Sequence, residues 1–174
     1  FSLDLSLMDV NQSERDALKD KVAKAFDDMA ALESGAIANP DEGRMVGHYW
    51  LRKPEIAPSA EIKAQITEPL KALKKFAEQV HTGQVRTPAG GVFKQVLLIG
   101  IGGSALGPQL VSQAIGQKAK LPLAFLDNTD PQGIDETLAT LKLAETLVLV
   151  ISKSGGTPET RNGMLEAKAA FDKA

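Results

Sequence analysis

The chain has 174 residues, of which 43% are hydrophobic and 24% are charged, with no cysteine and a net charge of −2 at neutral pH. This composition is typical of a folded globular protein, and the near-zero charge gives no electrostatic support for binding nucleic acid or an anionic membrane. The lack of cysteine excludes disulfides, thiolate catalysis and cysteine-based metal sites, and two histidines are too few for a histidine-rich metal cluster, so no metal is expected.

The first part of the chain is predicted to be helical. Apolar residues recur at helical spacing from Ser13 to about Leu32, with Ser13 as the expected N-cap and Gly35 as the expected stop. Residues 38–58 contain three prolines and are predicted to be irregular.

A second helical pattern begins after Ser59 and continues to Val80. Pro69 lies inside this pattern, and we expect it to kink or split the helix because proline lacks the N–H that an interior turn needs. Residues 82–91 hold three glycines and a proline, which indicates a loop.

Beyond residue 92 the pattern changes to short apolar runs that alternate with amphipathic helical stretches. Strands are predicted at 96–99, 121–126 and 146–151, and helices at 105–115, 134–141 and from Pro158 to the chain end. This alternation predicts an α/β fold with a parallel, doubly wound, Rossmann-like sheet. We therefore expect a helical segment over residues 1–91 and a sheet domain over 92–174. Three strands are fewer than usual, so we expect an incomplete sheet in a piece of a longer protein, a small complete domain being the alternative.

Two glycine-rich turns follow the first and third predicted strands, at residues 100–104 and 152–157. The carboxyl ends of parallel strands lie along one edge of a sheet, so both turns can reach one ligand. Backbone N–H groups, hydroxyls and helix amino termini together bind phosphate. The second turn supplies three hydroxyls and one ammonium group, from Ser152, Ser154, Thr157 and Lys153. We expect a small phosphorylated ligand here, with Lys153 either paired with the phosphate or turned to solvent.

The first turn also fits a dinucleotide-binding pattern. Gly100-x-Gly102-x-x-Ala105 matches that fingerprint, and Asp127 ends the next predicted strand, where a ribose-binding acid would lie. Ser104 adds a hydroxyl that the fingerprint does not need, and the second hydroxyl-rich turn is not required in a dinucleotide half. A simple phosphate ligand is therefore favoured, and an NAD-binding dehydrogenase half remains the competing interpretation.

Four other residues could take part in chemistry. His48 lies beside the only tyrosine and tryptophan, and we expect a packed, hydrogen-bonded histidine rather than a general base. His81 is expected at the carbonyl end of a helix. Asp127 and Asp130 could form an acid/base pair, but Asn-Thr-Asp-Pro is a common turn and helix-capping sequence, which we favour.

Several segments together resemble the glucose-6-phosphate isomerase family. They are residues 99–108 and 151–160, which contain the two turns, the Asp-Asn-Thr-Asp-Pro turn between them, and residues 42–48 with Leu51 and Arg52 upstream. The Ser-Lys-Ser-Gly type of loop occurs in sugar-isomerase (SIS) domains generally, whereas the whole set is more specific. The resemblance extends from about residue 39 to the chain end and implies that the sheet is part of a first SIS domain.

The resemblance implies an enzyme of glycolysis and gluconeogenesis that isomerises a hexose 6-phosphate through an enediol without a cofactor. The residues that match the family's phosphate-binding loops are Gly103, Ser104, Ser152, Lys153, Ser154 and Thr157. The catalytic glutamate, arginine, histidine and lysine are expected beyond residue 174, so Glu159 and His48 are not assigned to those roles.

The resemblance further implies a homodimer in the cytoplasm. Neither a transmembrane-length apolar run nor a signal-peptide pattern is present, which agrees with that location. A non-catalytic SIS module that binds a phosphosugar is the alternative from another functional class.

Overall fold

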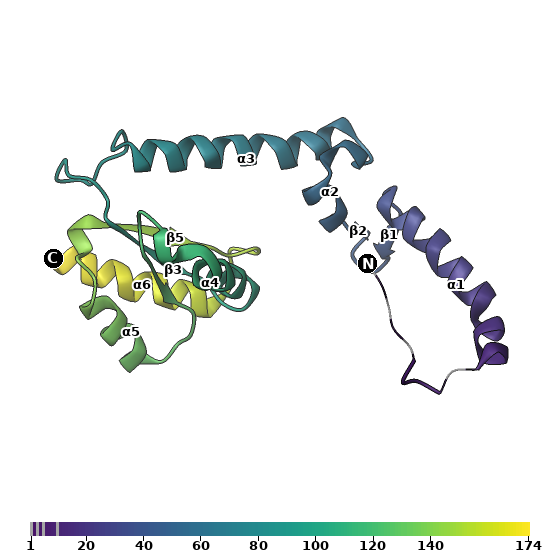
Figure 1. Ribbon diagram of the computed structural model, residues 1–174. Coiled ribbons are helices and arrows are strands. Elements are labelled where there is room, and N and C mark those ends of the chain that lie inside the picture. Colours follow the sequence, from purple (N-terminus) through teal and green to yellow (C-terminus); the bar gives the residue numbers. More distant parts are fainter. Residues whose placement is uncertain (1, 3, 5, 10) are drawn as a thin grey trace. The chain divides into compact units, whose positions relative to one another are not determined.

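The computed structural model describes residues 2, 4, 6–9 and 11–174, apart from the side chain of Gln117 (Figure 1). The chain divides into two units, Phe1–Leu73 and Lys74–Ala174. The division falls inside the long helix α3 (Ala60–His81). The domain boundary predicted between residues 91 and 92 stays a prediction, and each unit is described by itself.

The first unit begins with the predicted helix, α1 (Gln12–Glu33), but its N-cap is Asn11 and not Ser13. The Asn11 Oδ1 accepts a hydrogen bond from the Glu14 N–H at 3.0 Å, and the Glu14 carboxylate accepts one from the Asn11 N–H at 2.9 Å. The prediction of Ser13 was wrong because the reciprocal pair needs a Glu three residues after the cap, and Glu14 holds that position only for Asn11.

Gly35 ends α1, as predicted. Its φ of 98° places it in the left-handed region, which glycine adopts without steric cost. Its N–H bonds to the Leu32 carbonyl at 3.0 Å, and the Ala36 N–H bonds to the Ala31 carbonyl at 3.0 Å. These two bonds satisfy carbonyls that the end of a helix leaves without partners.

The segment predicted to be irregular contains short regular elements. They are the antiparallel strands β1 (Ile37–Asn39) and β2 (Arg44–Met45), the helix α2 (His48–Arg52) and the 3-10 helix η1 (Pro54–Ile56). The prediction was wrong here because elements of two to five residues are too short to show a periodicity. Trp50 of α2 is 3% exposed and donates its indole N–H to the Glu33 carbonyl at 2.8 Å.

Helix α3 begins after Ser59, whose hydroxyl accepts the Ile62 N–H at 3.2 Å. The helix continues through Pro69 without a break, so the expected split was wrong. Pro69 removes a single interior hydrogen bond, and helical turns on both sides of it continue the ladder. The predicted loop after α3 is confirmed, with positive φ at Gly83 and Gly90.

The second unit has the predicted strand–helix alternation. Its elements are β3 (Gln95–Ile99), α4 (Gly103–Ile115), η2 (Gly116–Lys118), β4 (Leu123–Leu126), α5 (Pro131–Ala139), η3 (Leu143–Glu145), β5 (Thr146–Val150) and α6 (Pro158–Lys173). The strands pair in parallel in the order β4-β3-β5, so β3 is central. The β3–α4–β4 connection crosses the sheet in one direction, and the β4–α5–β5 connection crosses it in the other. Because such connections share one handedness, α4 and α5 lie on opposite faces of the sheet (Figure 1).

The core of this unit lies between the sheet and helices α5 and α6. Leu97 and Ile99 of β3 are 0% and 1% exposed, and they pack with Leu126, Ile134 and Ala167. A Cβ at Gly163 of α6 would lie 3.1 Å from the Ile99 Cγ2 atom, so this helix packs closely on the sheet. The parallel α/β fold is therefore confirmed, and its carboxyl edge carries the two glycine-rich turns.

Candidate functional site

The second turn is closed by its own hydroxyls. The Ser152 and Thr157 side chains, which come after β5 and before α6, are hydrogen-bonded to one another at 3.3 Å. The Gly155 N–H donates to the Ser152 Oγ at 3.0 Å, and the Gly156 N–H donates to the Ser154 Oγ at 3.1 Å. Gly155 has a φ of 72°, a conformation that lets the chain reverse between the strand and the helix.

A cavity of about 380 Å³ opens beside this turn, a volume within the usual range for small-molecule sites. It is lined by Val150, Ser152, Gly155, Thr157, Thr160, Arg161 and Met164. Thr157 is the N-cap residue of α6, but its side chain makes no capping hydrogen bond. The hydroxyls of Ser152 and Thr157, that of the buried Thr160, one guanidinium and the start of a helix therefore surround a space that an anion can enter.

The first turn lies against the end of β5. A Cβ at Gly100 would lie 3.0 Å from the Ser104 Cβ and 3.1 Å from the Ile151 carbonyl oxygen, so only glycine fits without a shift. The Ile151 N–H also donates to the Ile99 carbonyl at 2.8 Å. Both turns therefore meet at one edge of the sheet. Gly102 has a φ of 55° and is the N-cap residue of α4, which Gly103 and Ser104 begin.

The structure places the six predicted site residues at this edge but not all in the cavity. Ser152 and Thr157 line it, whereas Gly103, Ser104, Lys153 and Ser154 are not among its lining residues. Lys153 and Ser154 are exposed, and Ser104 is half-buried at the start of α4.

Arg161, which also lines the cavity, was not predicted from the sequence. The motif used for the prediction ended at Thr160, one residue before it. The available signal was the helical spacing, because Arg161 lies four residues after Thr157 and so on the same face of α6.

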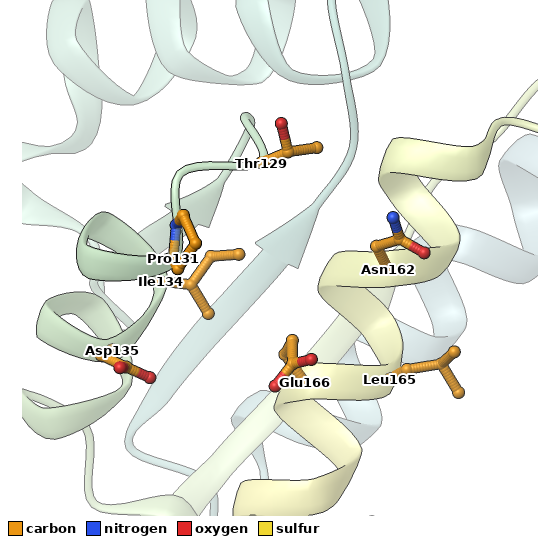
Figure 2. A pocket seen from close by; sticks show the side chains of 7 residues that line it. All are labelled: Thr129, Pro131, Ile134, Asp135, Asn162, Leu165 and Glu166. Carbon is orange, nitrogen blue, oxygen red and sulfur yellow. The ribbon is translucent and has the colours of Figure 1, made fainter.

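A larger cavity, of about 500 Å³, lies between the start of α5 and helix α6 (Figure 2). Figure 2 shows Asp135 and Glu166 on the two helices that border it, with Asn162 and Thr129 nearer its upper end. Its lining includes these two carboxylates and no lysine or arginine. The two negative charges disfavour a phosphate there, so the cavity beside Ser152 suits an anion better.

The two aspartates between β4 and α5 have structural partners. The Asp127 carboxylate accepts the Gln109 side-chain amide at 2.6 Å and that of Asn128 at 3.2 Å. Asp130 is the N-cap of α5, and its carboxylate accepts the Gly133 N–H at 2.7 Å. The capping interpretation is confirmed.

The two histidines lie outside the cavity. His48 is exposed at the start of α2, and its ring centroid lies 3.9 Å from that of Tyr49. The expected packing is therefore present against one neighbour, whereas the expected hydrogen bond is absent among the described residues. A helix of five residues at the surface leaves the imidazole largely in solvent. His81 is the last residue of α3, the position expected for it.

A parallel sheet with helices on both faces and two glycine-rich turns at its carboxyl edge is the arrangement of an SIS-type α/β protein. The chain belongs to the phosphoglucose isomerase family, whose model matches residues 4–174. The resemblance seen in the sequence is therefore confirmed.

Proteins similar to this chain agree with that membership. It is 55% identical over 175 residues to the glucose-6-phosphate isomerase of Cyanothece sp., covering 99% of this chain and 33% of that protein. It is 58% identical over 174 residues to the glucose-6-phosphate isomerase of Synechococcus elongatus, and the match covers 98% of this chain and 33% of that protein. The crystal structure of a glucose-6-phosphate isomerase from Chlamydia trachomatis matches 94% of this chain and 33% of that one, with 26% identity and a TM-score of 0.75. The chain thus spans about a third of the length of these relatives.

Within the part of the chain that the structure describes, no helix has the combined length and hydropathy needed to cross a membrane. No group of three or more histidine and carboxylate side chains lies close enough there to hold a metal ion.

Proposed function

We propose that this chain is the amino-terminal third of a glucose-6-phosphate isomerase and that it binds the phosphate of a hexose 6-phosphate. The whole enzyme would interconvert glucose 6-phosphate and fructose 6-phosphate. The single observation that carries the binding role is the pair of Ser152 and Thr157 hydroxyls, 3.3 Å apart, facing a cavity at the carboxyl edge of the sheet. Identities of 55% and 58% to glucose-6-phosphate isomerases support the reaction.

The proposed binding is by charge-assisted hydrogen bonds. Ser152 and Thr157 donate their hydroxyl protons to phosphate oxygens once they exchange their mutual bond for the ligand. Gly103 and Ser104 supply donors from the adjacent first turn, and Lys153 and Ser154 complete the set if the turn closes on the ligand.

The proposed role in catalysis is anchoring. Isomerisation moves a proton between C1 and C2, which needs a base near those carbons and a positive group for the developing oxyanion. Phosphate binding accelerates this step only if it holds the distant carbons against those groups. We place those groups in the rest of the polypeptide, and the family relationship supports a cytoplasmic homodimer as the assembled enzyme.

The test is to replace Ser152 and Thr157 by alanine in the full-length isomerase. Each lost hydrogen bond to a charged group costs about 1.5–3 kcal/mol, so kcat/KM for glucose 6-phosphate should fall about 10- to 150-fold per substitution. A coupled assay measures the fall, and Thr140→Ala, which removes a hydroxyl at the end of α5, serves as the matched control. Unchanged kinetics in the double variant would show that the phosphate binds elsewhere.

The dinucleotide alternative is tested with the same protein. The Asp127 carboxylate, which would have to bind a ribose, is held by Gln109 at 2.6 Å. Calorimetry should therefore show binding of inorganic phosphate and none of NAD. Tight NAD binding that Asp127→Ala abolishes would favour a dehydrogenase half instead.

A further inference from the structure

Arg161 places a guanidinium beside the two hydroxyls of the candidate site. Arg161 lies one helical turn after Thr157, and its backbone N–H donates to the Thr157 carbonyl at 3.1 Å. Side chains on a helix lean toward its amino terminus, so a long side chain at this position extends toward the Ser152 turn. Arg161 lines the cavity with Ser152 and Thr157, whereas Lys153 does not.

This guanidinium has no carboxylate within its own helix that could neutralise it. The positions three and four residues away on either side are Thr157, Pro158, Met164 and Leu165, all uncharged. Glu159 is two residues away, a spacing at which helical side chains do not face each other. Among the described residues, the ion pair within α6 joins Lys168 to Asp172, and no ion pair includes Arg161.

We infer that Arg161 is the cation that binds the phosphate in this cavity, an inference that rests on the proposed phosphate-binding function and names a residue for it. A guanidinium is planar and stays charged at any physiological pH, and its donors form two parallel hydrogen bonds to one phosphate. With Ser152 and Thr157 it surrounds the space from the helix side and from the turn. Lys153 is exposed and does not line this cavity, so it contributes less.

The experiment titrates the full-length isomerase with inorganic phosphate by calorimetry at one fixed pH and ionic strength, since salt screens such contacts. Arg161→Gln should weaken phosphate binding about 10-fold. This is the lower end of the range expected for losing a hydrogen bond to a charged group, because the Arg161 side chain is exposed and solvent screens its charge. Arg161→Lys should restore part of the affinity, because it keeps the charge and loses the two-pronged geometry. Lys173→Gln removes one positive charge at the other end of α6 and should change nothing.

The outcomes separate this inference from the proposed function. Circular dichroism of each variant confirms that the fold is retained. If Ser152→Ala and Thr157→Ala weaken phosphate binding while Arg161→Gln does not, or if Lys153→Gln weakens it more than Arg161→Gln does, the assignment of Arg161 is wrong and the site stands. If none of these substitutions changes the affinity, the phosphate site itself is wrong.

Discussion

The first unit buries one side chain among its described residues, Trp50, whereas the second buries a continuous cluster shared by β3, β4, α5 and α6. Helix α1 leaves its apolar stripe in solvent, with Leu18, Val22, Phe26 and Met29 each at least 43% exposed. Its stability within this chain therefore depends on caps and local ion pairs. The sheet depends on long-range packing, which stabilises a fold more strongly. The candidate site lies on the unit with the rigid core.

Removing a core side chain should give the largest effect. Leu97 is fully buried, so Leu97→Ala should lower the free energy of unfolding by about 2–5 kcal/mol through lost packing and the cavity left behind. Phe26→Ala is the matched change in the first unit, where the side chain is 71% exposed, and should cost at most about 0.5 kcal/mol. Urea unfolding followed by circular dichroism measures both, and comparable losses would remove the contrast between the units.

The turn after α1 should give the next largest effect. Gly35→Ala forces an L residue to a φ of 98° and places its Cβ 2.9 Å from the Cβ of Pro58. Strain and overlap together should cost about 2–3 kcal/mol. Trp50 is the only tryptophan in the chain, so its fluorescence reports the first unit.

Gly43→Ala separates the two contributions to that cost. Gly43 also has a positive φ, 62°, but its Cβ would meet nothing within 4 Å, so only the backbone strain of about 1 kcal/mol should appear. If both variants shift the fluorescence midpoint equally, the contact with Pro58 contributes nothing.

A smaller, local effect is expected at the start of α1. Asn11→Ala removes the cap and should cost about 1 kcal/mol, seen as faster hydrogen exchange of amides in the first helical turn. Ser13→Ala is the control, since this hydroxyl does not cap the helix, and should leave exchange nearly unchanged. The reverse order of effects would restore Ser13 as the cap.

The smallest effect concerns an ion pair of the second unit that joins residues 51 positions apart. The hydrogen bond from Lys94, at 2.6 Å, lowers the pKa of Glu145 below its usual 4.5, against a smaller opposing effect of desolvation. A lowered pKa means that the pair stabilises the fold above pH 4.5 and loses this contribution as the pH falls through the lowered value.

Comparing wild type with Glu145→Gln tests this pair. The difference in unfolding midpoint should shrink as the pH is lowered below 4.5. Asp16 of α1 makes a similar bond to Lys19 within its own helix, so Asp16→Asn should show the same trend with the loss confined to α1. A difference that does not vary with pH would mean that the Lys94 contact does not persist in solution.

Much of this protein follows from the sequence alone. The short apolar runs predicted the three strands, because a buried strand needs a continuous apolar segment. The glycines in the turns after the first and third runs predicted a phosphate-type site, because such a turn needs glycine. The same turns, with the segments around them, indicated the family that the comparisons confirm. Gly35 as a helix stop and Asp130 as a cap were predictable because capping depends on a few neighbouring residues.

Tertiary structure decided the rest. The short strands β1 and β2 and the unbroken passage of α3 through Pro69 depend on bonds and turns that periodicity does not report. The choice of Asn11 over Ser13 is local, because it depends on Glu14 three residues after the cap. Arg161 lines the cavity because the end of β5 meets the start of α6, and this meeting is produced by packing of α6 on the sheet. A sequence specifies which donors are available. The direction in which each one points is set by contacts between residues far apart in the chain.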